Sequence, residues 1–84
     1  MKIIVKEVIA TIKRVEGRPQ AFMDEGTETV VGEEPIPSED ANLNVLELSK
    51  KIGDENQKAI DIARATLYPA ERERVVKITR KVLA

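Results

Sequence analysis

The sequence predicts an α+β fold in which a small antiparallel N-terminal sheet of two to three strands is followed by an acidic loop and three C-terminal helices. Three observations support this prediction: β-branched residues crowd the start of the chain, acids with interspersed Gly and Pro fill its middle, and apolar residues recur at helical spacing near its end. We expect one small domain over residues 1–84, with a β-rich part at 2–31, a mobile acidic loop at 32–38 and a helical part at 39–83.

Residues 3–15 are predicted to form the first strand because eight of these thirteen residues are β-branched. The alternation of apolar residues slips near Lys6-Glu7, and a β-bulge there would return them to a single face. A turn signal follows at residues 17–19. The same segment also fits a helical template, so an all-α fold with residues 2–16 helical is the alternative.

The acidic middle of the chain begins with two short predicted strands, at residues 20–23 and 27–31, which are separated by a turn at 24–26. Residues 24–40 contain seven acids and no base, together with two glycines and two prolines. A segment of this composition buries little apolar surface, so we expect mobility around residues 32–38.

The C-terminal half is predicted to be helical throughout. Ser38 suits the N-cap of a first helix that stops at Gly53, although residues 45–48 also fit a buried strand. A second helix is expected over residues 54–67, and Pro69 suits the first turn of a third. The joint before Pro69 is too short for the turn of a DNA-binding helix-turn-helix.

The composition argues against catalysis and against metal or cofactor binding. The chain has no Cys and no His, so it lacks thiolate ligands and the commonest general base, and we expect no enzyme activity. The acids Asp24, Glu25 and Glu28 do not match the spacing of a calcium loop, and four scattered glycines form no phosphate loop. The longest apolar run, residues 3–5, is too short to cross a membrane, so we expect a cytoplasmic protein.

The best interpretation of function is therefore a small non-catalytic protein–protein interaction or structural module. Its partner would be another protein or a second copy of the chain in a homodimer. The predicted final helix carries a wide apolar stripe, and such a surface on a small domain is typical of an interface. The partner-binding candidates are Val75, Ile78, Val82 and Leu83.

Nucleic-acid binding is the alternative interpretation, with Arg74, Lys77 and Lys81 as the phosphate-binding candidates on the same helix. The charge is unevenly placed: it is +3 over residues 1–18, −8 over 19–63 and +4 over 64–84. A pI of about 5.5 argues against a strong binder, and no aromatic residue interleaves the bases. The acidic middle can instead neutralise the two basic ends within the fold.

Overall fold

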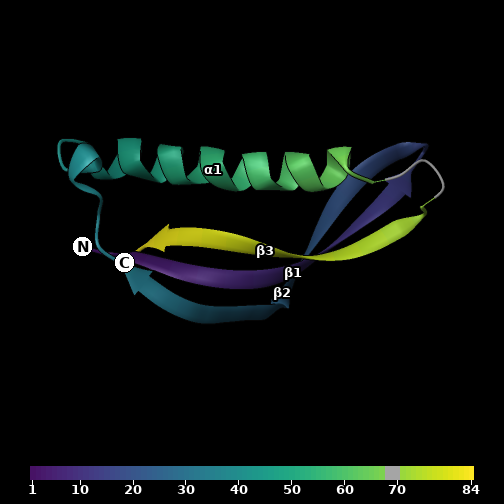
Figure 1. Ribbon diagram of the computed structural model, residues 1–84, viewed down its shortest axis with the longest axis horizontal. Helices are drawn as coiled ribbons and strands as arrows, with labels where there is room; N and C mark the ends of the chain where they lie inside the picture. Colours follow the sequence, from purple (N-terminus) through teal and green to yellow (C-terminus); the bar gives the residue numbers. More distant parts are fainter. Residues whose placement is uncertain (68–70) are drawn as a thin grey trace.

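The computed structural model describes residues 1–67 and 71–84, and shows a three-stranded antiparallel sheet with one long helix along one of its faces (Figure 1). The elements are β1 (Ile3–Val15), β2 (Arg18–Glu34), a 3-10 turn (Ser38–Asp40), α1 (Val45–Ala65) and β3 (Glu73–Leu83). The strand order is β2-β1-β3, so the first strand of the chain lies in the centre of the sheet. The molecule is elongated, with extents of 45 × 22 × 15 Å.

β1 and β2 form a hairpin, and β3 returns to the other side of β1 after the helix. The hairpin turns at Glu16 and Gly17, which both have positive φ, of 54° and 80°. Positive φ at two central residues is the geometry of a tight turn whose twist matches the flanking strands. The ends of the chain lie side by side, because Lys2 and Ala84 exchange backbone hydrogen bonds of 3.0 and 3.1 Å (Figure 1).

The predicted bulge in β1 is wrong. β1 pairs with β3 in unbroken register along its length, and at the two places where its pairing with β2 shifts, near Lys6 and near Val8, the extra residues lie on β2. Ile3 and Val8 are five residues apart, yet both side chains pack in the clusters beneath α1. Regular alternation places them on opposite faces of the strand, so the twist of the long sheet, rather than an extra residue, turns both toward the helix.

β2 is a single strand where two short strands with a turn between them were predicted. The residues of the predicted turn form a local bulge within β2 instead: Ile9 pairs with Asp24, whereas Glu7 pairs with Thr29. Two side chains hold this bulge. The carboxylate of Asp24 accepts the Gly26 N–H at 3.1 Å, and the Thr27 hydroxyl accepts the Ile9 N–H at 2.9 Å.

The core consists of two apolar clusters along α1. In the first cluster, Ile3 packs with Leu48 and Ile52 of the helix. In the second, Val8, Ala10 and Ile78 pack with partly buried neighbours that include Ala59 and Ile60 of α1. A helix of 21 residues is about 31 Å long, so α1 reaches along most of the sheet and covers both clusters.

The prediction of three C-terminal helices is wrong, and so is the all-α alternative. The helix expected to start at Ser38 forms only a 3-10 turn there. The α-helix begins after Asn44, whose side chain accepts the Glu47 N–H at 2.9 Å, and continues through Gly53. The first two predicted helices therefore correspond to the single helix α1. The predicted joint at Tyr68-Pro69 lies outside the described residues.

The predicted final helix is the strand β3. Five of the eight residues from 75 to 82 are β-branched, and such side chains favour a pleated strand over a helix. β3 pairs with β1 in unbroken register from Leu83 opposite Ile3 to Glu73 opposite Lys13. This pairing supplies backbone hydrogen bonds and cross-strand packing, which outweigh the helical spacing of the apolar residues.

Candidate interaction surface

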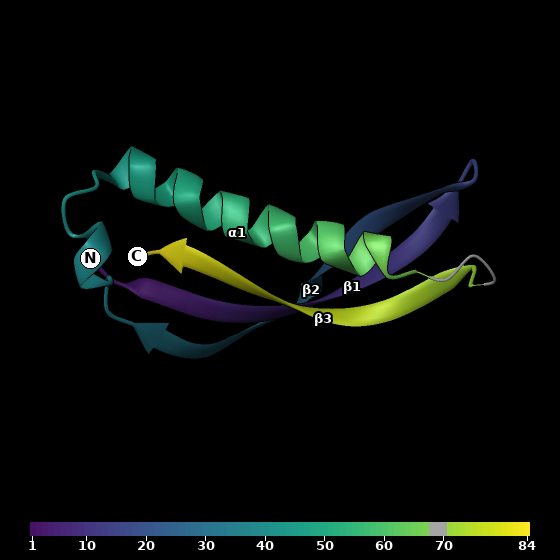
Figure 2. The ribbon, with the colours of Figure 1, turned by 45° about the horizontal axis from the view of Figure 1, so that its top comes forward.

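In the hairpin half of the sheet the helix covers one face, and no element among residues 1–67 and 71–84 packs on the opposite face (Figure 2). In the hairpin half of β1, Val8, Ala10 and Ile12 are at most 1% exposed and point toward α1. Because side chains alternate along a strand, Ile9 and Thr11 point the other way. This side of the sheet is therefore a surface, although its strands carry apolar residues.

Three cross-strand rows make up this surface, which we call the uncovered face. The middle row runs from Phe22 through Thr11 to Val75, and is the most apolar. Phe22 is 46% exposed and Val75 is 62% exposed. The flanking rows are Asp24–Ile9–Lys77 and Gln20–Lys13–Glu73.

The charges on the uncovered face are balanced. It carries two acids and two bases, which are Asp24, Glu73, Lys13 and Lys77. The Lys13 ammonium lies 5.9 Å from the centroid of the Phe22 ring, within the range of a cation–π contact. The surface is thus an apolar strip flanked by charges of both signs, a composition typical of protein interfaces with a polar rim.

A cluster of ion pairs joins β2, β1 and β3 beside the bulges. Lys6 Nζ lies 2.8 Å from a Glu28 carboxylate oxygen, and Arg80 lies 3.0 Å from Glu28 and 2.8 Å from Glu25. The hydrogen bond from Lys6 is the main cause that lowers the pKa of Glu28 below its usual value of 4.5. Lys2–Glu33 and Lys81–Glu34 add two further links. The acidic middle of the chain therefore pairs with both basic ends within the fold.

The four partner-binding candidates all lie on β3, but not on one surface. Ile78 is 4% exposed within the second core cluster, and Leu83 packs against the first. Val82 is half-buried. Val75 alone among the four belongs to the uncovered face.

The three phosphate-binding candidates are separated in the same way. The Arg74 guanidinium donates to the carboxylate of Glu71, with one of these bonds at 3.0 Å. Lys81 lies 3.4 Å from Glu34 and 4.0 Å from Glu55. Lys77 is exposed on the uncovered face. The structure does not bring these three side chains to one surface.

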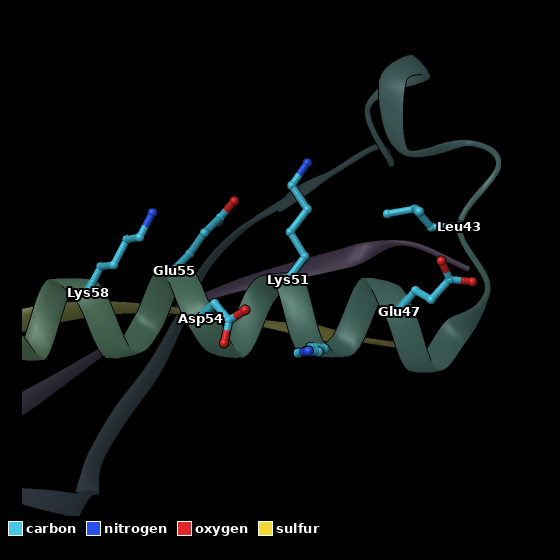
Figure 3. Close-up of a pocket in the computed structure, with 7 residues that line it drawn as sticks. Leu43, Glu47, Lys51, Asp54, Glu55 and Lys58 are labelled. Atoms are coloured by element: carbon cyan, nitrogen blue, oxygen red, sulfur yellow. The ribbon is translucent and has the colours of Figure 1, made fainter.

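A shallow groove of about 540 Å³ runs along α1 and the segment before it (Figure 3). Lys51, Glu55 and Lys58 project from the same side of the helix there, beside Leu43. Lys51 forms an ion pair with the buried carboxylate of Asp40, and this hydrogen bond raises the pKa of Lys51 above its usual value of 10.5. A lysine that is held protonated is not a nucleophile. Lys51 therefore serves in this groove as the partner of Asp40.

Metal-binding and membrane-spanning features are also missing from the described part of the chain. Within residues 1–67 and 71–84, no group of three or more acidic side chains is placed to hold a metal ion. In the same residues, no helix combines the length and the apolar character needed to cross a bilayer. The chain matches no protein-family model, no curated protein and no solved structure.

Most residues of the uncovered face are not among the candidates that the sequence predicts. The sequence places Ile9, Thr11 and Phe22 in strands, but nothing in it places them beside Val75. The signal that was available is the density of β-branched residues from 75 to 82, which identifies β3 as a strand. With β3 assigned to the sheet, the alternation of β1 leaves a second apolar face without a cover.

Proposed function

We propose that this protein is a non-catalytic interaction module that works as a homodimer, with the uncovered face as its interface. The observation that carries the proposal is the exposed row of Phe22, Thr11 and Val75 across all three strands. Apolar patches that are rimmed by polar residues mark interaction sites on small proteins. An isologous contact between two copies would cover this patch on both chains at once.

The surface area of the chain is consistent with the burial of one face against a second copy. A compact monomer of 9.4 kDa is expected to expose about 5,000 Å², whereas this chain exposes 5884 Å². The excess of roughly 900 Å² is close to the ~800 Å² that each partner buries in a standard interface. The radius of gyration agrees: it is 14.7 Å, against about 12 Å for a compact domain of this length.

The test compares two β-branched residues of similar exposure, one on the uncovered face and one on α1. Val75→Glu places a carboxylate in the centre of the uncovered face, and Ile62→Glu places one on α1, where Ile62 is 65% exposed. We expect a dimer for the wild type and for Ile62→Glu by light scattering, and a folded monomer for Val75→Glu. A wild-type protein that is monomeric up to millimolar concentration would refute the homodimer.

Nucleic-acid binding by the uncovered face is a second candidate, which the position of Lys13 beside Phe22 favours. A base can stack on an exposed aromatic ring while a neighbouring cation contacts phosphate. Asp24 and Glu73 on the same face oppose such binding. Light scattering in low and high salt separates the two functions, because phosphate contacts weaken steeply with salt whereas an apolar interface does not. We expect a dimer that survives high salt and does not bind a single-stranded oligonucleotide.

A further inference from the structure

We infer that the two copies pair about a two-fold axis that runs along β1, so that β2 of each copy lies over β3 of the other. This inference rests on the homodimer proposed above. Two sheets that pack face to face keep their strands nearly aligned. The axis of a symmetric pair then runs either along the central strand or across it, and the two choices bring different residues together.

An axis along β1 matches the rows of the uncovered face to one another. Asp24 and Lys77 flank Ile9 in one row, on β2 and β3. Exchange of β2 and β3 places Asp24 opposite Lys77 of the second copy, and symmetry repeats this pair. In the middle row, Phe22 lies opposite Val75 of the second copy. The apolar middle row thus meets the middle row of the second copy, and Ile9 lies opposite Ile9 of the second copy.

An axis across the strands reverses the order of the rows. The row of Ile9 then meets the row of Lys13, which places Lys77 opposite Glu73 of the second copy but covers the Lys13 ammonium with the hydrocarbon side chain of Ile9. Removing a charge from water without a partner is costly. With the axis along β1 the two Lys13 residues approach each other, but each lies over its own Phe22 ring and beside Glu73 in its own row.

Single cysteines test this geometry directly, because the chain contains no cysteine. Phe22→Cys and Val75→Cys are prepared separately, one of them with a mass tag, and are treated with a short bis-maleimide alone and after mixing. We expect the mixture to give the Phe22→Cys/Val75→Cys cross-link and each variant alone to give little. An axis across the strands predicts the opposite result, with strong self-cross-linking of Phe22→Cys. Ile62→Cys is the control for random collisions.

Charge substitutions test the axis independently, should the cysteine variants fail to form a dimer. Asp24→Asn keeps an oxygen that can accept the Gly26 N–H but loses the charge, and Lys77→Gln removes the other partner. We expect each change to weaken the dimer about threefold to tenfold, and the double variant to be no weaker than the single ones. The same comparison is made with Lys77→Gln and Glu73→Gln. If the effects of these two changes on dimer affinity are coupled and those of Asp24→Asn and Lys77→Gln are not, the axis runs across the strands and the inference is wrong.

The outcomes separate the inference from the function on which it rests. A dimer whose Phe22→Cys variant cross-links to itself overturns the axis along β1 and leaves the homodimer in place. A wild-type chain that is monomeric by light scattering overturns both.

Discussion

Lys13 and Phe22 are in contact on the face of the sheet that α1 leaves uncovered, with the Lys13 ammonium 5.9 Å from the centroid of the ring. The two residues lie on neighbouring strands, Lys13 on β1 and Phe22 on β2. Phe22 remains 46% exposed. In the proposed homodimer it would be the largest apolar side chain of the interface.

The first prediction concerns Phe22→Ala. When only the folded chain dimerises, mass action makes the melting temperature rise with protein concentration. We expect this rise for the wild type and a smaller rise in Phe22→Ala, because the substitution removes the largest apolar side chain of the uncovered face. Scanning calorimetry over a hundredfold range of concentration measures it. Ile62→Ala on α1 should keep the wild-type slope, and a slope in Phe22→Ala equal to that of wild type would contradict the role given to this face.

The second prediction contrasts two glycines. Gly53 lies within α1, and a Cβ added there meets no atom within 4 Å. We expect Gly53→Ala to stabilise the protein by about 0.5–1 kcal/mol, because glycine costs that much in a helix interior. Gly17 also has free space, but its φ of 80° disfavours a side chain, so Gly17→Ala should destabilise by about 1 kcal/mol. Urea unfolding of the two variants should give changes of opposite sign.

The third prediction concerns Ile12, which is fully buried beneath α1 at 0% exposure. Ile12→Val removes one methylene group and should lower the free energy of unfolding by about 1 kcal/mol. Ile12→Ala leaves a larger cavity and should cost about 3 kcal/mol, a large share of the total for a small domain. The control is Ile62→Val at an exposed site, which should change the free energy by less than about 0.5 kcal/mol. Equal effects at the two sites would show that Ile12 is not in the core.

The fourth prediction is a pH dependence that arises from Glu28. Its pKa in the folded protein is lowered, chiefly by the hydrogen bond from Lys6 and also by Arg80, so the ionised form favours folding. This contribution is complete above the usual pKa of 4.5 and is lost as the pH falls through the lowered value. We expect Glu28→Gln to be less stable than wild type at pH 7 and the difference to shrink at pH 3.

Urea unfolding at the two pH values measures this difference. Glu39→Gln, at an exposed glutamate outside the cluster, is the control and should show no such convergence. A Glu28→Gln variant that is as stable as wild type at pH 7 would contradict the stabilising role of the Lys6–Glu28 pair.

The sheet was predictable where the information is local. The β-branched density of residues 3–15 identifies β1, whereas the parity slip at Lys6-Glu7 wrongly indicates a bulge in this strand. The apolar spacing of residues 54–67 likewise identifies the second half of α1. The predicted helix boundary at Gly53 is wrong, because a glycine in the interior of a helix resembles a stop signal.

β3 was not predictable in the same way because its structure depends on β1, about sixty residues away. Its apolar spacing fits a helix, and its charges suit the ends of one. Its density of β-branched residues favours a strand instead, and the pairing with β1 decides between these two conflicting local signals. The uncovered face shares this origin, since its rows exist only once three separate strands are in register. Val75 as a partner-binding residue stays a prediction.

The number of residues between Ile3 and Val8 determines which side chains of β1 face α1. Before Lys6-Glu7 the buried side chain is Ile3, and after it Val8, Ala10 and Ile12 are buried, although their positions differ in parity from that of Ile3. Loss of a single residue at this point would turn the three buried side chains outward without changing any of them. Half of the core therefore depends on the number of residues in the strand, and an insertion or deletion here has consequences that no single substitution reproduces.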